Sequence, residues 1–270
     1  MGVVSTVLTL DAAFAFVTGT LLYFAPHFFS DILFQRKSDG VHWHLVRCIG
    51  GQILASSFVS YRFRNSSGSS HTVCHIIRVI PSILLLVLLY QCQSMTPDLI
   101  PLLALKGLKS LMFFTVALHF FWLLVGKWQV GNQLCKSDTL GNFLYQLDAV
   151  ASVCIGAAWM TFPKWLLHRQ VLVDLDESHE LCGRVMGALF ISSYVVSTHA
   201  LYWESQRDRN VAIDGRVLCC LSILAAQLWS QTYESWSGNH WIGITLFSTW
   251  TVISLIYRTY IGVKGKSHRE

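Results

Sequence analysis

Charged residues are scarce in this sequence. Of its 270 residues, 13% are Asp, Glu, Lys or Arg, compared with roughly 25% in soluble domains. Hydrophobic residues make up 53% of the chain, and the mean hydropathy is +0.47. A soluble protein of this length has no way to cover so much apolar surface. We therefore expect an integral membrane protein of the endoplasmic reticulum, another endomembrane or the plasma membrane.

Patterns that identify a reaction or a cofactor are missing as well. The eight cysteines contain no Cys-x-x-Cys pair and no zinc-type Cys–His cluster, so neither a disulfide framework nor a zinc module is expected. G-x-S-x-G, a Walker loop and a Cys–His–Asp nucleophile set are absent, so no catalytic residue is assigned. A haem or metal site needs two histidines on facing helices at equal depth, and the sequence reveals no such pair. No cofactor and no metal are therefore expected.

The net charge of +5 does not indicate a nucleic-acid site. The 20 Lys and Arg residues lie between apolar runs rather than in one patch with aromatic residues. Such positions are typical of charges that flank membrane spans. The expected partner is membrane lipid, with another membrane protein as the alternative, and nucleic acid is not expected.

Eight apolar stretches are long enough, or nearly so, to cross about 30 Å of hydrocarbon as helices. The third contains Pro81 and the seventh contains Gln227, and both residues need neighbouring helices to cover them. The connectors are short, so no separate soluble domain is expected. The predicted fold is all-α, a polytopic membrane protein with spans at 4–25, 43–62, 76–94, 108–127, 141–162, 181–202, 216–233 and 240–261.

The sequence repeats itself at an offset of 137 residues. Residues 10–60 and 147–197 share 12 identities in 51 positions without a gap, where chance gives about 3. The matches include Asp, Gly, Pro, His and Arg, which hydrophobicity alone does not align. The third helices also correspond after a one-residue slip, through RVIPSILLL and RVLCCLSIL. These matches predict two four-helix transmembrane repeats, residues 1–136 and residues 137–270, the second with a short basic cytosolic tail.

Four helices per repeat give both repeats the same orientation, related by a pseudo-twofold axis along the membrane normal. We therefore expect two similar four-helix bundles that lie side by side. The connectors on the side of the termini, together with the tail, contain twelve Lys and Arg residues, against six on the opposite side. The positive-inside rule then places both termini in the cytosol.

Each repeat carries the same set of polar and small residues. The first helix has an early Asp, a mid-span Gly and a final Pro, followed by a stretch that suits a short helix in the non-cytosolic interface. A D-x-x-H-x-x-x-x-R-x-x-G pattern opens the second helix, and its Gly lets a neighbouring backbone approach closely. The shared polar residues are Asp11, Asp39, His42 and Arg47 in the first repeat and Asp148, Asp176, His179 and Arg184 in the second.

Arg47 and Arg184 lie at the edge of apolar runs, where a permanent charge is costly. Three interpretations are open. The side chain snorkels to the interface, or anchors the re-entering chain on a loop carboxylate (Asp39 or Asp176) or on free carbonyls, or binds an anionic head group or substrate. Recurrence in both repeats favours the anchor, because a duplicated fold needs it twice.

Asp11 and Asp148 lie deeper, about 10 Å in from the cytosolic face by their positions in the first helices. The second-helix arginines are too far along the membrane normal to reach them. Arg78 and Arg216 open the third helices at a compatible depth, so we expect the ion pairs Asp11–Arg78 and Asp148–Arg216. A proton or cation relay through the two Asp residues is the alternative.

Three features carry a family resemblance: the Gly and Pro of the first helix, the interfacial segment, and the Arg followed by Gly of the second helix. With these, the first two helices of each half resemble the DoxX-like group of small four-helix membrane proteins. The resemblance covers about 100 residues and implies a four-helix fold, here in tandem. Members of that group handle small molecules or help membrane assemblies, and this chain departs from them by its duplication. The matching residues are Gly19, Pro26, Arg47 and Gly50, and Gly156, Pro163, Arg184 and Gly187.

These observations predict a non-enzymatic binding or assembly factor with a groove between the repeats that contacts lipid or a partner helix. One alternative is a carrier or channel for a small solute, which needs a continuous polar path along the repeat interface. The other is a lipid-modifying enzyme, which needs a His or an acid in a laterally open pocket. The candidate residues are Asp11, Asp148, Gln52 and Gln227 for the path, and His44, Glu180 and His199 for the enzyme.

Overall fold

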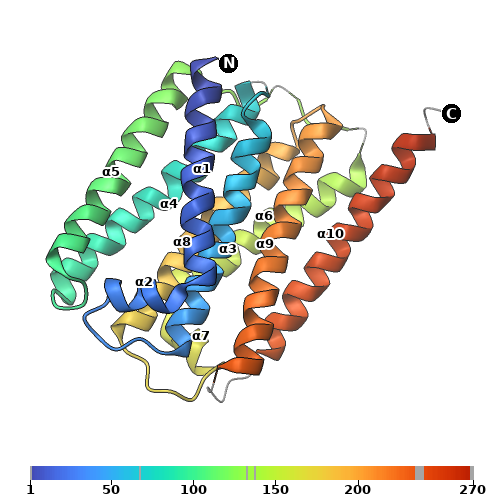
Figure 1. Cartoon of the computed structure of the whole chain (residues 1–270). Coiled ribbons are helices and arrows are strands. Elements are labelled where there is room, and N and C mark those ends of the chain that lie inside the picture. Colours follow the sequence, from blue (N-terminus) through green and yellow to red (C-terminus); the bar gives the residue numbers. More distant parts are fainter. Residues whose placement is uncertain (1, 67, 132, 137, 235–239, 268–270) are drawn as a thin grey trace.

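The computed structural model describes residues 2–66, 68–131, 133–136, 138–234 and 240–267, the last four by their backbone alone. These residues form ten helices and no strand, which confirms the all-α fold. The predicted repeat boundary at residue 137 and the last three residues of the predicted tail lie outside the described residues. The helices are α1 (Val3–Phe24), α2 (Pro26–Leu33), α3 (Gly40–Phe63), α4 (Gly68–Met95), α5 (Leu102–Val125), α6 (Thr139–Thr161), α7 (Pro163–His168), α8 (Glu177–Ala200), α9 (Gln206–Tyr233) and α10 (Trp241–Ser267) (Figure 1).

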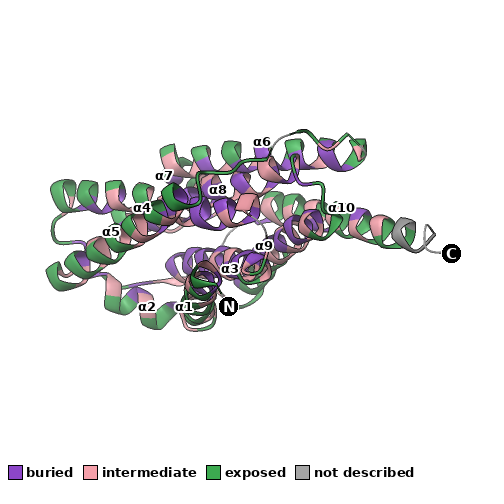
Figure 2. Cartoon of the chain, turned by 90° about the horizontal axis from the view of Figure 1, so that it is seen from above, coloured by how far each residue is buried: buried purple, intermediate pink, exposed green. Residues whose placement is uncertain are grey.

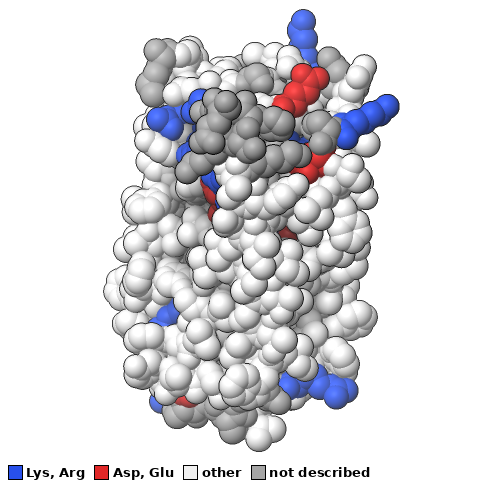
Figure 3. All heavy atoms as spheres, turned by 90° about the vertical axis from the view of Figure 1, so that its right-hand side faces the viewer, with Lys and Arg blue, Asp and Glu red and all other residues white. Residues whose placement is uncertain are grey.

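Six helices, α1, α4, α5, α6, α8 and α9, are long and apolar enough to cross a membrane. The predicted spans 43–62 and 240–261 fall on α3 and α10, which are outside this set. On the face that includes α10, charged side chains gather mostly near the two ends of the molecule and leave a broad uncharged band between them (Figure 3). Large apolar side chains also remain exposed on outer helices, for example Phe113 and Phe114 of α5. These are features of an integral membrane protein.

The long helices form two layers (Figure 2). One layer contains α5, α4, α8 and α6 in that order, the other contains α1, α3, α9 and α10, and the layers meet where α3 packs on α8. Each layer combines helices from both halves of the sequence, since α4 of the first half packs on α8 of the second, and α9 of the second half packs on α3 of the first. The expected pair of separate bundles is therefore wrong. The exchange surrounds α3 and α8 with protein on several sides, and both have buried His and Ser side chains that need such cover.

The short helices α2 and α7 occupy the places expected for interfacial segments. Pro26 and Pro163 stand at their first positions, where the missing N–H of proline leaves no hydrogen bond unmade. The residues before them, Ala25 and Phe162, depart from helical conformation and end α1 and α6. Each proline thus separates a long helix from a short one.

Matched glycines let α1 approach α3, and α6 approach α8. A Cβ added to Gly50 would lie 2.8 Å from the carbonyl oxygen of Gly19, and one added to Gly187 would lie 2.7 Å from the carbonyl oxygen of Gly156. Both contacts are with backbone, which cannot rotate away. The close backbone approach expected at Gly50 and Gly187 is confirmed.

We expect Gly50→Ala and Gly187→Ala each to destabilise the protein by about 1–3 kcal/mol, because the added methyl overlaps a neighbouring helix backbone. Helix propensity alone predicts the opposite sign, since it favours Ala over Gly by about 1 kcal/mol. Gly107→Ala in α5 is the control, because a Cβ there meets nothing within 4 Å. Thermal unfolding in detergent measures all three, and equal midpoints for Gly187→Ala and Gly107→Ala would contradict the tight crossing.

Candidate functional site

Asp39 and Asp176 cap the N-termini of α3 and α8 in the same way. The Asp39 carboxylate accepts hydrogen bonds from the backbone N–H groups two and three residues later, at 2.9 and 3.2 Å. The Asp176 carboxylate does the same at 3.0 and 3.4 Å. In return, Nδ1 of His42 and of His179 accepts the backbone N–H of its own capping Asp, at 3.3 and 3.1 Å. Both D-x-x-H motifs are therefore capping boxes, with His where Glu or Gln is usual.

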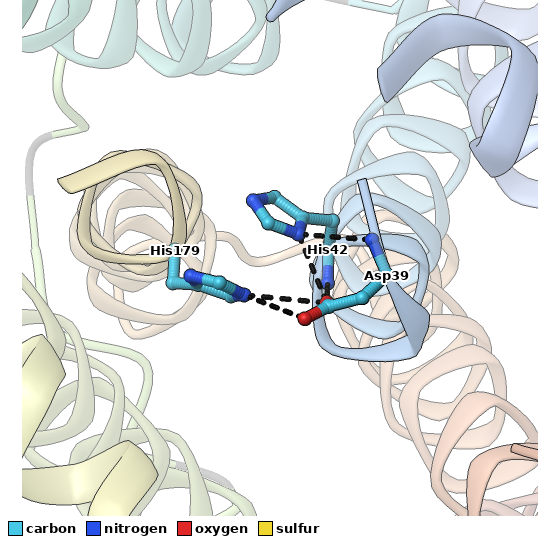
Figure 4. Close-up of side chains that lie close together, drawn as sticks. All are labelled: Asp39, His42 and His179. Atoms are coloured by element: carbon cyan, nitrogen blue, oxygen red, sulfur yellow. Dashed lines mark hydrogen bonds and ion pairs between the residues drawn. The ribbon is translucent and has the colours of Figure 1, made fainter. Parts of the chain in front are cut away.

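The two capping boxes lie against each other, and Figure 4 shows His179 of the second beside Asp39 and His42 of the first. Nε2 of His179 lies 3.1 Å from Oδ2 of Asp39, and the rings of His42 and His179 have centroids 3.8 Å apart. Nε2 of His42 lies 2.7 Å from the hydroxyl of Ser178. We call Asp39, His42, Asp176 and His179 the cap cluster. Two histidines thus face each other on neighbouring helices, contrary to what the sequence suggested.

The two carboxylates of the cap cluster are ionised and are held by nearby hydrogen-bond donors. Arg36, on the loop before α3, lies 3.0 Å from Asp176 and 2.5 Å from Glu177. Burial raises the pKa of the Asp39 and Asp176 carboxyls, but hydrogen bonds outweigh it and hold both pKa values well below their ordinary range. At Asp39 these bonds come from the two histidines, and at Asp176 chiefly from Ser178 and Arg36. Both carboxylates are therefore ionised at neutral pH.

Arg47 forms a largely buried ion pair with a glutamate at the C-terminal end of α9. Its Nη1 lies 2.9 Å from Oε1 of Glu234, and both side chains are largely buried, at 14% and 9% exposure. The guanidinium also lies 5.2 Å from the ring centroid of Trp229. The expected anchor on Asp39 is wrong, and so is that of the second repeat on Asp176, because these carboxylates cap helices and bind the histidines instead.

Arg184, the sequence match of Arg47, borders an open cleft of about 310 Å³ between the end of α4 and the start of α8. Within the described part of the chain, its guanidinium makes long contacts, 3.3 Å to Gln91 and 3.4 Å to Glu180. Its Nε is buried and has no hydrogen-bond partner among the described residues. We call this space the Arg184 cleft, and its lining includes Leu88, Gln91, Met95, Thr96, Glu180 and Arg184.

Both expected ion pairs are present deeper in the helices. Nε of Arg78 lies 2.9 Å from Oδ2 of Asp11, and Nε of Arg216 lies 2.6 Å from Oδ1 of Asp148. The side chains of both pairs are between 9% and 13% exposed. In each half, therefore, the first helix is tied to the third by a nearly buried charge pair.

Sequence reasoning missed partners that come from the later helices. His119 of α5 lies 3.3 Å from the first buried Asp, and the indole of Trp250 in α10 donates to the second at 2.9 Å. The sequence gives no signal for either partner, because His119 and Trp250 are different residue types and so do not appear as a matched pair in the two halves. Glu234 had a signal, since it is an acidic residue at the end of a predicted span on the same side as Arg47.

Arg216→Gln should lower the free energy of unfolding by about 3–5 kcal/mol, because it leaves the Asp148 carboxylate buried without its cation. Arg258→Gln is the matched control, since Arg258 is 37% exposed in its pair with Asp214 and such pairs contribute about 0–1 kcal/mol. Denaturation in detergent measures both variants. Losses of the same size would show that the Asp148 pair is not a buried one.

A family model matches residues 9–259, and it is described as a domain of unknown function, DUF8292. No curated protein and no solved structure matches the chain. The matched range includes the cap cluster, both ion pairs and the Arg184 cleft. Because the match covers nearly the whole sequence, the chain belongs to the DUF8292 family.

Proposed function

We propose that this protein crosses the membrane eight times, as two duplicated four-helix halves with both termini in the cytosol. Two observations support this. First, α1 begins and α10 ends at the same end of the molecule (Figure 1), as an even number of spans requires. Second, residues that match in sequence have matching roles in the capping boxes, the glycine crossings and the ion pairs. The resemblance to the DoxX-like group stays a prediction about fold.

The remaining two helices also suit a membrane. α3 is not among the six helices that are apolar enough to span a membrane by composition, but its polar residues, such as His44 and Gln52, are buried inside the protein rather than turned to lipid. α10 exposes large apolar side chains, including Ile242, Val252 and Ile256. Both helices are longer than the roughly 20 residues that a span needs.

The proposed function is non-enzymatic binding of a membrane phospholipid in the Arg184 cleft. The main support is that Arg47 and Arg184 match in sequence but differ in their surroundings. Glu234 lies 2.9 Å from Arg47, whereas Arg184 borders an open cleft and its ion pair with Glu180, among the described residues, is longer, at 3.4 Å. A guanidinium with a buried, unsatisfied nitrogen favours an added acceptor, because burying an unpaired donor is costly.

The alignment of α4 with α9 explains why the two sites differ. With the one-residue slip, Thr96 stands where Glu234 stands in the second half, and Gln91 stands where Trp229 stands. Thr96 and Gln91 both line the Arg184 cleft. The carboxylate and the aromatic ring that satisfy Arg47 are thus replaced by a hydroxyl and an amide. An external anion at Arg184 would take the role of the Glu234 carboxylate.

The charges of the cleft favour a head group that has both a phosphate and an amine. Arg184 offers the fork of donors that phosphate oxygens accept. Glu177 and Glu180 also line the cleft, and they would repel a purely anionic head group but pair with an ammonium. Leu88 and Leu181 provide apolar walls for the start of the acyl chains. A volume of about 310 Å³ lies at the lower end of the range for ligand pockets, about 300–1,000 Å³.

A solute carrier has less support. The cavity between the two layers, next to Gln52 and Arg216, has a volume of about 50 Å³, room for only a few water molecules. The two aspartates expected to line a polar path are engaged in ion pairs.

A lipid-modifying enzyme also has less support. Of its three candidate groups, Glu180 lines the Arg184 cleft. His44 is bonded to the hydroxyl of Ser230, and His199 donates to the carbonyl of Val195. The described residues that line the Arg184 cleft with Glu180 include no histidine, which favours binding over catalysis in this cleft.

Lipid-dependent thermal stability tests the proposal. Purified protein in maltoside detergent is heated with dioleoyl phosphatidylethanolamine, phosphatidylcholine, phosphatidylglycerol or diacylglycerol. We expect the two zwitterionic lipids to raise the unfolding midpoint, phosphatidylglycerol to raise it less, and diacylglycerol, which lacks the phosphate, to have no effect. Arg184→Gln should weaken the zwitterionic response at least tenfold in the lipid concentration required.

Two variants make this test specific. Thr96→Glu transplants the carboxylate of Glu234 to the cleft, so it should close the site, abolish the lipid response and leave the protein at least as stable. Arg47→Gln should destabilise the fold, because Glu234 loses its cation, but it should keep the lipid response. An unchanged response in both Arg184→Gln and Thr96→Glu would overturn the lipid site.

A further inference from the structure

We infer that Asp39, His42 and His179 form a binding site for a divalent transition-metal ion of the zinc type, shared between α3 and α8. One donor atom from each of the three residues lies within 4.8 Å of the other two. The three side chains converge from both layers of the fold (Figure 4). The site is separate from the Arg184 cleft, so the inference stands or falls without the proposed lipid binding.

The donor separations fit a common ion. Nδ1 of His42 lies 2.9 Å from Oδ1 of Asp39, and Nε2 of His179 lies 3.1 Å from Oδ2. Ligands bound to zinc at about 2.0–2.1 Å lie roughly 2.9–3.4 Å apart at angles between octahedral and tetrahedral. Each histidine nitrogen therefore lies at the spacing of one coordination sphere from an oxygen of Asp39, and Oδ1 alone is 2.9 Å from His42 and 3.2 Å from His179.

The surroundings of His179 call for a cation. Both of its ring nitrogens face carboxylates, Nδ1 at 2.8 Å from Asp176 and Nε2 at 3.1 Å from Asp39. A neutral imidazole has one N–H, so one of these contacts brings a nitrogen lone pair against an anionic oxygen. Either a second proton or a metal ion relieves that repulsion.

A metal ion fits this arrangement better than a proton does, because Asp39 collects two imidazole nitrogens rather than one. Two histidines and one carboxylate around one point are a recurrent ligand set for zinc and for iron(II). With a metal at Nε2, Nδ1 of His179 would carry the ring proton and donate it to Asp176, 2.8 Å away, instead of accepting the backbone N–H of Asp176. That bond is the second-shell contact that directs Nε2 of a ligating histidine towards its metal. Asp176 is therefore a positioning residue rather than a ligand. At His42, the metal would likewise replace the backbone N–H that Nδ1 accepts.

Exposure gives the ion a way in. His42 and His179 are 1% and 4% exposed, whereas the side chain of Asp39 is 42% exposed. The carboxylate thus lies at the mouth of the site with the imidazoles behind it. Three protein ligands also leave a coordination position for water or another small ligand. A bound ion would join α3 to α8, the two helices where the layers meet.

Metal titration of the full-length protein in detergent tests the inference. We expect the chelator-treated wild type to take up one Zn²⁺ per chain, with a higher unfolding midpoint. His179→Gln and His42→Gln should each weaken Zn²⁺ binding at least 100-fold. Asp176→Asn should weaken it about 10–100-fold, as loss of a second-shell carboxylate does. His119→Gln, a buried histidine outside the cluster, should leave Zn²⁺ binding unchanged.

The absorption spectrum of bound cobalt(II) distinguishes this site from one formed by the eight cysteines. Co²⁺ bound by histidine and carboxylate gives weak d–d absorption with no intense thiolate charge-transfer band in the near ultraviolet. That spectrum, lost in His179→Gln, supports the site. A thiolate band, one-to-one Zn²⁺ binding that survives both His→Gln variants, or no Zn²⁺ uptake by folded wild type would each overturn it.

Discussion

The contact between the N-termini of α3 and α8 is the constraint on which the rest of the structure depends. The first backbone N–H groups of a helix have no partner within the helix, and near a membrane they find few elsewhere. Asp39 and Asp176 satisfy them on their own helices, and Asp39 also reaches His179 on the other helix. This shared carboxylate links the N-termini of α3 and α8. Arg47 and Arg184 lie about two turns after these N-termini, so the contact also fixes where the two arginines lie.

The same constraint explains why the halves exchange helices. α3 and α8 meet at the centre, and each has a face of buried His and Ser side chains that lipid cannot solvate. Packing α9 on α3 and α4 on α8 covers those faces from a second side. The buried pairs Asp11–Arg78 and Asp148–Arg216 then tie each first helix to a third helix in the opposite layer. The outer helices, by contrast, are free to expose apolar side chains.

Much of this could be predicted from the sequence, and the limits have physical reasons. Gly50 and Gly187 revealed the close crossings, because only a residue without a side chain permits them, and the charges of Arg78 and Arg216 had few partners at their depth. The arginines at 47 and 184 were harder. Residues at matched positions suggest equal roles, but the roles depend on Glu234 and Thr96, which differ at matched positions of the two halves of the sequence. The facing histidines required knowing that the two D-x-x-H motifs meet in space.

The two matched arginines thus have different surroundings. The second half supplies a carboxylate that seals the first arginine, and the first half leaves the second arginine open. The meeting of the two helix starts is tested most directly by a double-mutant cycle of Asp39→Asn and His179→Gln, measured as unfolding free energy in detergent with chelator present. The account predicts a coupling energy of about 1–3 kcal/mol. Strictly additive effects would contradict it, because they would mean that the two side chains do not touch.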